Sequence, residues 1–478
     1  MLCEICRKNN VSFTIVSLLG SKVKEISVCE DCATSDTKSV IHKPEKQPLF
    51  RKCPNCGFEQ RIDHNTFYDN SHNNIPLFGC PLCYDNFHDE LITLLRRLHG
   101  STKHRGKVIK RSGSLVKNNE HNLASCFRHI STISPEAKWM QGDGPDFDVV
   151  ISSRIRLARN LDGHLFCSIA DETELKDIAD TVEYALSDLK SCNYLQNMYI
   201  INLDEIDNVD RELMIERHLI SRDLAERKGT RKVIIGEEGI LSIMLNEEDH
   251  IRLQVIDSGL QIRELWNIID YIDNELACKV NYAFSSDYGY LTTCPSNVGT
   301  GLRVSVMIHI PALAGTRDGN KILSSISDMG YCLRGFYGEG SQAIGSFYQI
   351  SNEVTLGQTE EEIIENIQSV ALQILEYERR ARRLLMKENR IGLEDKVFRS
   401  YGILTNARAI SYKEALNLLS WVSLGNDLGI ISGLDKASIA KLLVLTQPAH
   451  LQKVNCDISD TLKRDISRAE LIRVTLTN

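Results

Sequence analysis

The 478-residue sequence contains no run of about 18 apolar residues, so no membrane-spanning helix is expected. Its first ten residues, MLCEICRKNN, have no long apolar segment after a basic start, so they do not resemble a signal peptide. The content of 42% hydrophobic and 25% charged residues is that of an ordinary globular protein, and the length allows two to four domains. These features predict a cytoplasmic protein without a membrane partner.

The common phosphate-binding motifs are also missing. The Walker pattern G-x-x-x-x-G-K-[ST] does not occur. The stretches GTGLR and GFYGEG are too short and wrongly placed for the glycine loop of protein kinases, and no H-R-D or D-F-G set follows. A nucleotide site in this chain would have to be built from other residues.

Charge is distributed unevenly along the chain. Residues 1–130 contain 19 Lys and Arg against 13 Asp and Glu, whereas the remaining 348 residues contain 37 against 51. A basic front part joined to an acidic back part indicates two modules with different partners.

Cysteine is concentrated at the front of the chain. Eight of the fifteen cysteines form four Cys-x2-Cys pairs: Cys3/Cys6, Cys29/Cys32, Cys53/Cys56 and Cys80/Cys83. The first two pairs are separated by 22 residues and the last two by 23, which suits tetrahedral thiolate sites for zinc. A disulfide framework or a redox motif is the alternative. Four pairs in a chain without an export signal favour about two structural Zn²⁺ ions, each needed for its small module to fold.

A helical pattern and a basic stretch follow the last pair. YDNFHDELITLLRRLHG places five apolar side chains on one helical face: Phe87, Leu91, Leu94, Leu95 and Leu98. KHRGKVIKR comes next, and zinc ribbons followed by basic residues can bind nucleic acid. The stretch is short and the knuckles lack interleaved aromatics, so a solvated linker or a protein-docking surface is favoured instead. Residues 112–135 are interpreted as a linker.

The front part resembles the zinc-binding activator protein that accompanies bacterial protein arginine kinases (McsA). The similarity covers roughly residues 1–111 and rests on the four cysteine pairs, CYDNFHDEL and HRGKVIKR. The UVR-like helical hairpin at the C-terminus of that family has no counterpart here. Whatever that hairpin binds is therefore not implied for this chain.

Arginines recur in strand-like segments of the back part. In DFDVVISSRIRLARN, Arg154 and Arg156 would point to the same face of a strand. Arg252, Arg303 and Arg334 stand in similar apolar or glycine-rich segments. A strand face with two arginines is usually solvated. Buried guanidinium groups need anionic partners, however, and five of them together would match a triphosphate.

Six ordered motifs in residues 136–478 resemble the phosphagen (guanidino) kinase superfamily, and within it the bacterial protein arginine kinases (McsB). They are SSRIRLARN, HLIS, LNEEDHIR, YLTTCPSNVGTGLR, RGFYGEG and RDISRA. The resemblance implies an α/β (α+β) fold, with a large antiparallel sheet flanked by helices in residues 136–385. It also implies an all-helical domain for dimerisation and substrate recognition in residues 386–478.

The resemblance assigns roles by position. Glu248 and Glu339 would hold the acceptor guanidinium, and Cys294 would lie beside it, with a buried structural thiol as the alternative for Cys294. ATP, with its Mg²⁺, would be bound by the five arginines, by His218 and by the residues around them. The full set is Ser152, Ser153, Arg154, Ile155, Arg156, His218, Arg252, Arg303, Val304, Ser305, Val306, Met307, Arg334, Gly335, Phe336, Tyr337 and Gly338.

The stretch NEEDHIR places three carboxylates at one strand junction, where they repel each other. A solvated hairpin tip is one explanation and a catalytic site is the other. A guanidinium is a poor nucleophile because its lone pairs are delocalised. Two carboxylates would orient it toward the γ-phosphate and accept a proton, which favours the catalytic site. Asp249 and His250 are expected to brace the turn, and Glu247 to assist through water and Mg²⁺.

Two helical features lie near the end of the chain. Thr359 and Glu362 form a capping-box pattern before an apolar stripe, which predicts a helix start. In RDISRA, Arg464, Asp465 and Arg468 would share one helical face. An ordinary solvated charge face is the alternative, whereas the resemblance implies an allosteric phosphoarginine-binding pocket remote from the active site.

The sequence therefore predicts an ATP-dependent protein arginine kinase fused to its own zinc-binding activator. It would act on protein substrates with accessible arginines and form a homo-oligomer. In the family, arginine phosphorylation marks proteins for the Clp protease during stress, which implies a Clp unfoldase or protease as a partner. The alternatives are a kinase of free arginine or another small guanidine, and a zinc-dependent adaptor with an inactive kinase body.

Overall fold

The computed structural model describes residues 2–4, 7–11, 13–19, 22–29, 40–42, 49–63, 66–68, 75–109, 138–189, 193–195, 198–236, 239–335, 344–454 and 460–477. The chain divides into two compact units. The smaller consists of Met1–Arg51 and Gln60–His64, and the larger of Lys52–Glu59 and Asn65–Asn478. The linker expected at residues 112–135 lies outside the described residues. So do Cys6, Cys32 and residues 336–339 of the predicted sites.

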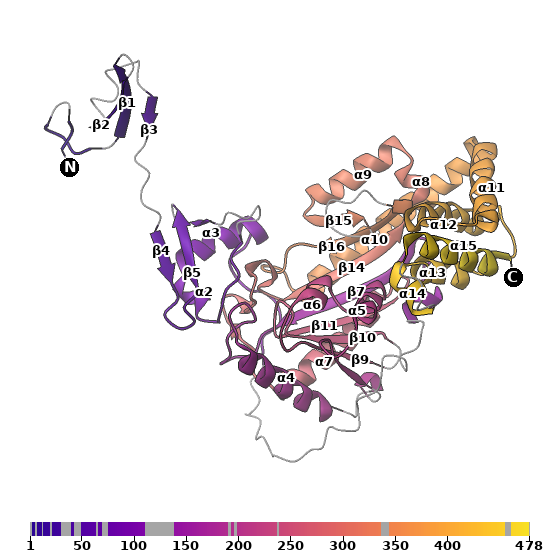
Figure 1. Ribbon diagram of the computed structural model, residues 1–478, viewed down its shortest axis with the longest axis horizontal. Coiled ribbons are helices and arrows are strands. Elements are labelled where there is room, and N and C mark those ends of the chain that lie inside the picture. Colours follow the sequence, from indigo (N-terminus) through magenta and orange to yellow (C-terminus); the bar gives the residue numbers. More distant parts are fainter. Residues whose placement is uncertain are drawn as a thin grey trace. The chain divides into compact units, whose positions relative to one another are not determined.

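The smaller unit contains a three-stranded antiparallel sheet in the order β2-β1-β3. β1 (Phe13–Leu19) and β2 (Lys22–Val28) form a hairpin in which Leu19 pairs with Lys22 (Figure 1). β3 (Val40–His42) lies on the other side of β1. Cys3 and Cys29 are both buried in this unit.

Strands β4 (Leu49–Lys52), β5 (Glu59–Asp63) and β6 (Thr66–Tyr68) follow along the chain. Next come the short helix α2 (Cys83–Asn86) and α3 (His88–His99). α3 buries Leu91, Leu94 and Leu95, which confirms the helical face predicted after Cys83.

The larger unit is built on an eight-stranded sheet in the order β15-β16-β14-β7-β11-β10-β9-β8, in which every neighbouring pair is antiparallel. This confirms the predicted sheet. Its strands are β7 (Val150–Arg159), β8 (Tyr199–Asn202), β9 (Lys232–Ile235), β10 (Leu241–Leu245), β11 (Ile251–Ser258), β14 (Leu302–His309), β15 (Tyr331–Gly335) and β16 (Phe347–Asn352).

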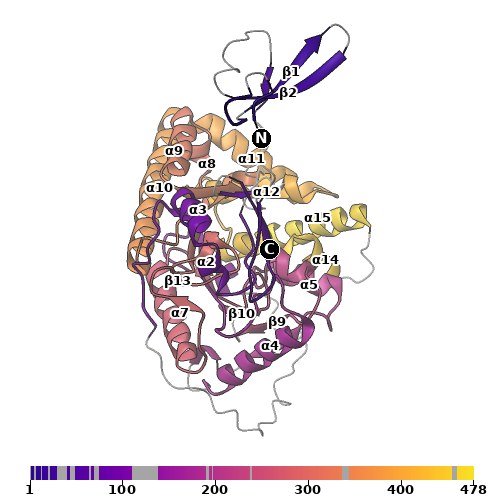
Figure 2. The same cartoon turned by 90° about the vertical axis from the view of Figure 1, so that its left-hand side faces the viewer.

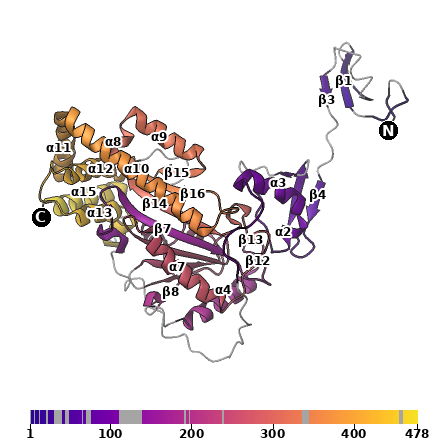
Figure 3. The same ribbon diagram turned by 180° about the vertical axis from the view of Figure 1, so that it is seen from behind.

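One face of this sheet carries the main hydrophobic core. α4 (Glu172–Ser187), α7 (Ile262–Ala277) and α10 (Glu360–Glu388) cover it, and side chains such as Ile155 and Val304 point toward them. α10 lies lengthwise along β14 and β16 (Figure 3), and α7 and α10 run along the same side of the sheet (Figure 2). Thr359 caps α10 in a complete capping box with Glu362, as predicted.

The opposite face of the sheet is only partly covered by apolar packing. α5 (Asn208–Glu216) and α6 (Arg222–Glu226) pack over β8, β9 and β10. At the other end, Met307 and Phe347 contact the C-terminal helices. The middle of this face, on β7, β11 and β14, is left to polar side chains.

The C-terminal helices gather at one end of the sheet (Figure 1). They are α11 (Arg390–Asn406), α12 (Tyr412–Asp427), α13 (Lys436–Leu445), α14 (Pro448–Val454) and α15 (Thr461–Thr477). Their shared core confirms the predicted all-helical region. Because α10 continues to Glu388, it crosses the boundary predicted at residue 385, and the exact domain limits stay a prediction.

Several short elements connect these layers. They are η3 (Lys138–Gln141), η4 (Asn193–Leu195), β12 (Phe284–Ser285), β13 (Gly289–Tyr290), η5 (Pro295–Asn297), α8 (Pro311–Ala314), α9 (Arg317–Asp328) and η6 (Ile344–Ser346). Among the described residues, no helix combines the length and the apolar character needed to cross a membrane.

Candidate active site

Strand register brings the five predicted arginines to one face of the sheet. Arg156 on β7 is the direct partner of Arg303 on β14, and Arg154 is the partner of Ser305. Arg252 lies on β11, whose alternate residues pair with the same side of β7. Arg334 reaches this face through β16, because its partner Gln349 accepts a hydrogen bond of 2.9 Å from Arg154. Paired strand residues point to the same side, so all five guanidinium groups lie on the face opposite the core.

These arginines line a cavity of about 980 Å³. Burial and the neighbouring cations Arg252 and Arg303 lower the pKa of Arg154 to about 10, and the same causes lower the pKa of Arg156. Burial is the larger cause of both shifts, and repulsion among the neighbouring arginines adds to it. An anion bound among the arginines would remove this repulsion.

The cavity also contains unused hydrogen-bond donors. Nε of Arg156 and Nε of Arg303 are buried and find no acceptor among the described residues. Buried donors are nearly always satisfied in folded proteins, so their orientation fits an anionic ligand rich in oxygen atoms. A nucleotide triphosphate has this chemistry, and the fit supports the predicted phosphate site.

The residues predicted beside the arginines divide into two groups. The side chains of Ile155, Val304 and Val306 lie in the hydrophobic core, so only their backbone atoms are available to a ligand. Ser305 Oγ accepts a hydrogen bond of 3.3 Å from Arg154 Nε, and Gly335 lines the cavity. Ser152 and Met307 pair with each other on the arginine face, whereas Ser153 donates to the carbonyl of Gly259 at 2.7 Å. Phe336, Tyr337 and Gly338 lie outside the described residues.

His218 lines the same cavity from the turn after α5. Its backbone has a φ of 59°, an uncommon value for a residue with a side chain. Its carbonyl accepts a hydrogen bond of 2.5 Å from Gln254 Nε2 on β11. Burial and the nearby Arg154 and Arg156 lower the pKa of His218 to about 3, so the imidazole is neutral.

The NEEDH turn between β10 and β11 is buried, which excludes a solvated hairpin tip. Asn246 is fully buried with a φ of 60°, and its side chain donates to the carbonyls of Leu175 and Thr230 at 2.7 and 3.0 Å. Asparagine tolerates positive φ better than most residues. The two amide bonds fix this strained turn against two other segments.

Asp249 and His250 brace the turn, as expected. Asp249 is buried and accepts hydrogen bonds from Asn160 Nδ2 at 2.7 Å and from the backbone N–H of Thr293 at 2.6 Å. His250 Nδ1 accepts from the N–H of Leu161 at 3.0 Å, so its other nitrogen carries the proton and donates to a carbonyl. Burial lowers the pKa of His250 to about 3, and it stays neutral.

Glu247 is committed to contacts within the protein. It pairs with Arg252, accepts from Ser221 Oγ at 2.5 Å and accepts from the backbone N–H of Glu248 at 3.0 Å. Burial alone would raise its pKa, but Arg252 and these hydrogen bonds lower the pKa of Glu247 to about 2. Glu247 therefore stays ionised and orients a phosphate-site arginine.

Glu248 has a different environment. Burial, together with the charges of Asp249, Glu247 and Asp223, raises the pKa of Glu248 to about 8. Its Oε1 accepts a hydrogen bond of 2.6 Å from Nδ2 of Asn297. Asn297 was not singled out from the sequence, although it lies in the quoted motif YLTTCPSNVGTGLR. It ties Glu248 to η5, the short helix that Cys294 precedes.

Cys294 lies beside this carboxylate. Burial and the negative charge of Glu248 raise the pKa of Cys294 to about 12, so the side chain is a thiol. Its Sγ is 3.0 Å from Ser296 Oγ. The structure thus brings Glu248 and Cys294 together, while Glu339 lies outside the described residues.

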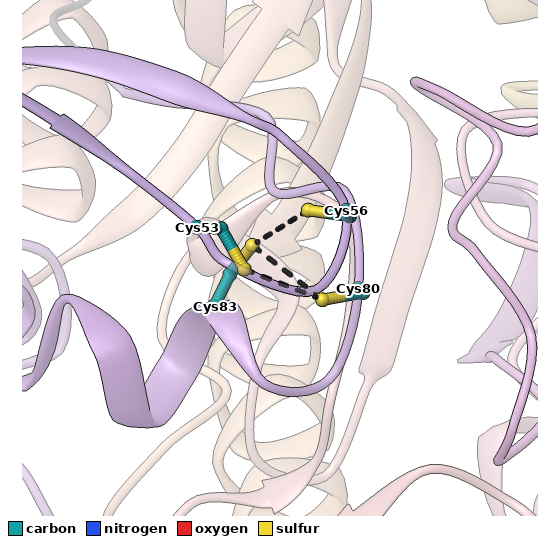
Figure 4. A group of neighbouring side chains, drawn as sticks. All are labelled: Cys53, Cys56, Cys80 and Cys83. Carbon is teal, nitrogen blue, oxygen red and sulfur yellow. Dashed lines mark hydrogen bonds between the residues drawn. The ribbon is translucent and has the colours of Figure 1, made fainter.

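Four cysteines of the third and fourth pairs form one cluster. The ligand atoms of Cys53, Cys56, Cys80 and Cys83 all lie within 4.8 Å of one another (Figure 4). Neighbouring sulfurs are 3.5 to 3.8 Å apart. A tetrahedral Zn²⁺ site with Zn–S bonds of about 2.3 Å requires sulfur separations of about 3.8 Å. Asn86 Nδ2, which is 3.4 Å from Cys53 Sγ, supports one ligand from outside.

Comparison with known proteins assigns these parts to one family. Residues 177–381 match the model of the ATP:guanido phosphotransferase C-terminal catalytic domain, and residues 390–478 match the McsB protein-arginine kinase C-terminal domain. Residues 51–106 match the McsA central zinc-finger domain. A protein-arginine kinase of Desulforamulus reducens is 44% identical over 345 residues, which are 72% of this chain and 97% of that protein. One of Halothermothrix orenii is 48% identical over 338 residues, which are 71% and 96% of the two chains.

The chain belongs to the protein-arginine kinase family. Solved structures agree on the fold: a lombricine kinase superposes with a TM-score of 0.51 at 20% identity, over 64% of this chain and 80% of that one. A duplicated taurocyamine kinase from Schistosoma mansoni superposes with a TM-score of 0.51 at 22% identity, over 69% of this chain and 46% of that one. ATP-dependent guanidino phosphotransfer and zinc binding by the front part are thereby confirmed.

This protein-arginine kinase packs residues 75–109, which include the second half of its zinc site, against its own catalytic body. The backbone N–H of Phe78 donates to the carbonyl of Thr293 at 2.8 Å, and Tyr84 Oη donates to the carbonyl of Thr292 at 2.8 Å. His99 Nε2 donates to the carbonyl of Pro295 at 2.9 Å. One backbone group and two side chains of the zinc-binding part thus bind the segment that contains Cys294.

Aromatic rings also pack between the zinc-binding part and the catalytic body. Phe78 packs edge-on against Tyr84 with centroids 4.9 Å apart, and Tyr84 lies 5.8 Å from Tyr288 of the catalytic body. At Gly79, a Cβ would come within 1.8 Å of Ile169 Cδ1 and 2.9 Å of Cys56 Sγ. The absence of a side chain at Gly79 allows the zinc knuckle to approach the catalytic body this closely.

The basic stretch beyond α3 also docks on the kinase body. Lys107 Nζ donates to Asp270 and Asp273, both at 2.9 Å, and Arg105 pairs with Glu362 at 3.1 Å. Of the two predictions for this stretch, the protein-docking surface matches these contacts. Its partner is the chain's own α7 and α10.

The C-terminal motif RDISRA forms part of α15. Arg468 is buried and donates to the carbonyls of Thr446 and Ile410 at 2.7 and 2.8 Å, and it pairs with Asp465. Arg464 lines the same cavity as the phosphate-site arginines, so the expected remoteness of this motif from the active site was wrong for Arg464. Phosphoarginine binding by this motif stays a prediction, with Arg464 as the cation that reaches the cavity.

Proposed function

We propose that this protein-arginine kinase is activated by its own zinc-binding segment, which holds the acceptor loop in place for phosphoryl transfer. The acceptor loop is residues 292–297. The observation that supports the proposal is the set of hydrogen bonds from Phe78, Tyr84 and His99 to this loop. In this proposal the kinase carries in one chain a support that a separate activator would otherwise supply.

The proposed chemistry uses the residues that surround the cavity. The five arginines hold the ATP phosphates, and one nitrogen of the substrate arginine attacks the γ-phosphorus in line with the departing ADP. Glu248 accepts the proton that this nitrogen loses, and with Glu339 it orients the guanidinium. Arg156 and Arg303 direct their unused N–H groups at the charge that develops on the phosphoryl oxygens.

The pKa of Glu248 suits this role. At about 8 it lies near neutral pH, which is where a general base is most effective. When the positive guanidinium of the substrate approaches, it favours the ionised carboxylate and lowers that pKa. Asn297 holds the carboxylate in position, and Cys294 provides a neutral thiol at the same site.

ATP brings Mg²⁺ to guanidino kinases. Glu247, the ionised carboxylate that pairs with Arg252, already uses both oxygens in contacts within the protein. The phosphates and water would therefore provide most Mg²⁺ ligands, which agrees with the preference of this ion for several bound waters. Asp223 and Glu212, which both line the cavity, are carboxylates available to that water shell.

The proposal extends to the biological role on the basis of family resemblance. Proteins phosphorylated on arginine by this kinase would be marked for a Clp protease during stress. The C-terminal helical domain would join two or more copies of the chain. Intact-mass analysis of casein and of free arginine after incubation with ATP tests the substrate class, with phosphate expected on the protein alone.

Tyr84→Phe tests the activating contact. It removes the hydroxyl that donates to Thr292 but keeps the buried ring, so we expect the turnover number to fall about 3- to 10-fold, as one lost hydrogen bond implies. The KM for ATP should stay within twofold of the wild-type value, because no arginine is touched. Zinc content, measured by elemental analysis, should not change.

Tyr288→Phe is the matched control. Tyr288, which precedes the acceptor loop in the chain, hydrogen-bonds His88 Nδ1 at 2.6 Å across the same interface. Equal losses in Tyr84→Phe and Tyr288→Phe would mean that the interface matters only for stability. Unchanged turnover in Tyr84→Phe would rule out the positioning role.

A further inference from the structure

The C-terminal helical domain contacts the nucleotide side of the catalytic body through α14, among other contacts. Glu216, the last residue of α5, accepts hydrogen bonds from the backbone N–H groups of Ala449 and His450 at 2.8 and 3.0 Å. Both groups belong to the first turn of α14, whose N–H groups have no partner within the helix. Glu216 therefore caps α14 from a different domain.

His450 makes two more bonds whose direction can be assigned. Arg217 Nε, which can only donate, is 3.2 Å from His450 Nε2, so this nitrogen is the acceptor. The proton of the neutral imidazole then lies on Nδ1, which donates to Glu216 at 2.7 Å. Burial lowers the pKa of His450 despite the nearby carboxylate, which keeps the ring in this neutral form.

These bonds end next to the nucleotide cavity. Arg217 is followed directly by His218, whose positive φ places its ring at the cavity wall. The carbonyl of Arg217 accepts from Trp139 Nε1 at 3.2 Å, and the rings of Trp139 and His218 lie 5.4 Å apart. An uncommon backbone conformation persists only where its surroundings hold it, and His450 is one of those supports.

The chain just before α14 is bonded to α15, the helix that carries RDISRA. Arg468 Nε donates to the carbonyl of Thr446, two residues before α14 begins. The contacts therefore run without a break from α15 through α14 and His450 to Arg217 and His218.

We propose that His450 is a positioning residue through which the C-terminal helical domain sets the geometry of the nucleotide cavity. The proposal rests on the proposed role of that cavity in ATP binding. His450 touches neither nucleotide nor substrate. It acts through Arg217 on the turn that presents His218.

His450→Asn separates the two bonds of the imidazole. The amide nitrogen of Asn lies near the position of Nδ1 and can still donate to Glu216, but nothing remains to accept from Arg217. We expect the KM for ATP to rise about 3- to 10-fold, the effect of one lost hydrogen bond, while the turnover number at saturating ATP stays within twofold. His450→Gln, whose carbonyl oxygen reaches toward Arg217, should restore much of the affinity.

Lys453→Ala is the matched control on the same helix. Lys453 pairs with Asp210 at 2.6 Å across the α14–α5 interface, three residues after His450 on α14. If Lys453→Ala raises the KM for ATP as much as His450→Asn does, the effect belongs to interface stability and the proposal fails. A KM within twofold of the wild type in His450→Asn also overturns it.

Two further variants keep the outcomes distinct. If His450→Asn does not fold, Arg217→Lys asks the same question, because lysine keeps the charge but lacks the Nε–H donor; an unchanged KM would overturn the proposal. Arg303→Ala tests the ATP site itself by equilibrium nucleotide binding. Unchanged binding in Arg303→Ala would remove the proposed nucleotide site, whereas weaker binding there with a normal KM in His450→Asn would remove only the role of His450.

Discussion

Two neighbouring glutamates in the NEEDH turn have opposite electrostatic environments. Glu247 faces Arg252 and has a pKa of about 2, whereas Glu248 faces other carboxylates and has a pKa of about 8. A pair of acids whose pKa values are pushed apart in this way is typical of sites that divide ionic and acid–base tasks. Glu247 pairs with Arg252, and in the proposed mechanism Glu248 is the group that accepts the proton.

Glu248→Gln should lower the rate of protein phosphorylation by about 10²- to 10⁴-fold, the usual effect of losing a positioned acid–base group. In the wild type, kcat/KM for the protein substrate should rise with pH up to about 8, because the reactive form is the deprotonated carboxylate. The corresponding limb of the kcat profile should lie at lower pH, since the bound guanidinium cation lowers this pKa.

Asn297→Ala provides the control for this profile. Removing its hydrogen bond to Glu248 takes away support for the charged carboxylate, so the limb should move to higher pH while remaining present. If Glu248→Gln kept the pH limb of the wild type, another group would be the base.

At the level of secondary-structure elements, residues 100–109 are attached to the catalytic body by one buried contact and one exposed contact. Lys107 reaches Asp273, which is fully buried and also bound by Arg159. Arg105 reaches Glu362 at the surface, where both side chains are about half exposed. The buried contact should carry most of the attachment energy.

Lys107→Ala should therefore lower the free energy of unfolding by about 1.5–3 kcal/mol, the range for hydrogen bonds to charged groups. Arg105→Ala should lower it by no more than about 1 kcal/mol, as exposed ion pairs do. Chemical denaturation of both variants gives the comparison. Equal effects would show that the segment is not anchored through Lys107.

The arginine face could be predicted from the sequence because strand alternation is local. Arg154 and Arg156 are two residues apart, and period-two geometry alone places them together. The bond from Tyr84 to Thr292 had no such pattern, since 208 residues separate the partners. The role of Asn297 could not be predicted for a related reason. Its hydrogen bond to Glu248 depends on how two loops that are distant in the sequence fold toward each other. The helical C-terminal region and the capping box at Thr359 were again local features, and both were confirmed.

At the scale of the whole molecule, the zinc site and the proposed acceptor loop are linked by direct packing. The zinc ligands Cys80 and Cys83 lie within a few residues of Phe78 and Tyr84, which hold the acceptor loop. A small module stapled by zinc loses its structure with the metal. Loss of zinc should therefore remove the contacts that Phe78 and Tyr84 make with the acceptor loop.

Elemental analysis of the reduced protein should find two Zn²⁺ per chain, one in the cluster of Cys53, Cys56, Cys80 and Cys83 and one at the first two cysteine pairs. Cys53→Ser should remove one of the two ions and lower kinase turnover, while ATP binding by the arginine cavity persists. Less than about one Zn²⁺ in the wild type would contradict the four-thiolate assignment, and normal turnover in Cys53→Ser would separate the metal from catalysis.

The docking of residues 75–109 on the same polypeptide also has a consequence for dosage. A separate activator acts only above its dissociation constant and is shared among competing partners. A tethered one meets its site at an effective concentration in the millimolar range, independent of expression level. Translation fixes the ratio of the zinc-binding segment to the kinase body at one to one, so under the proposed activation the two parts cannot be adjusted separately. If the zinc-binding segment activates the kinase as proposed, the supply of zinc becomes one determinant of its activity.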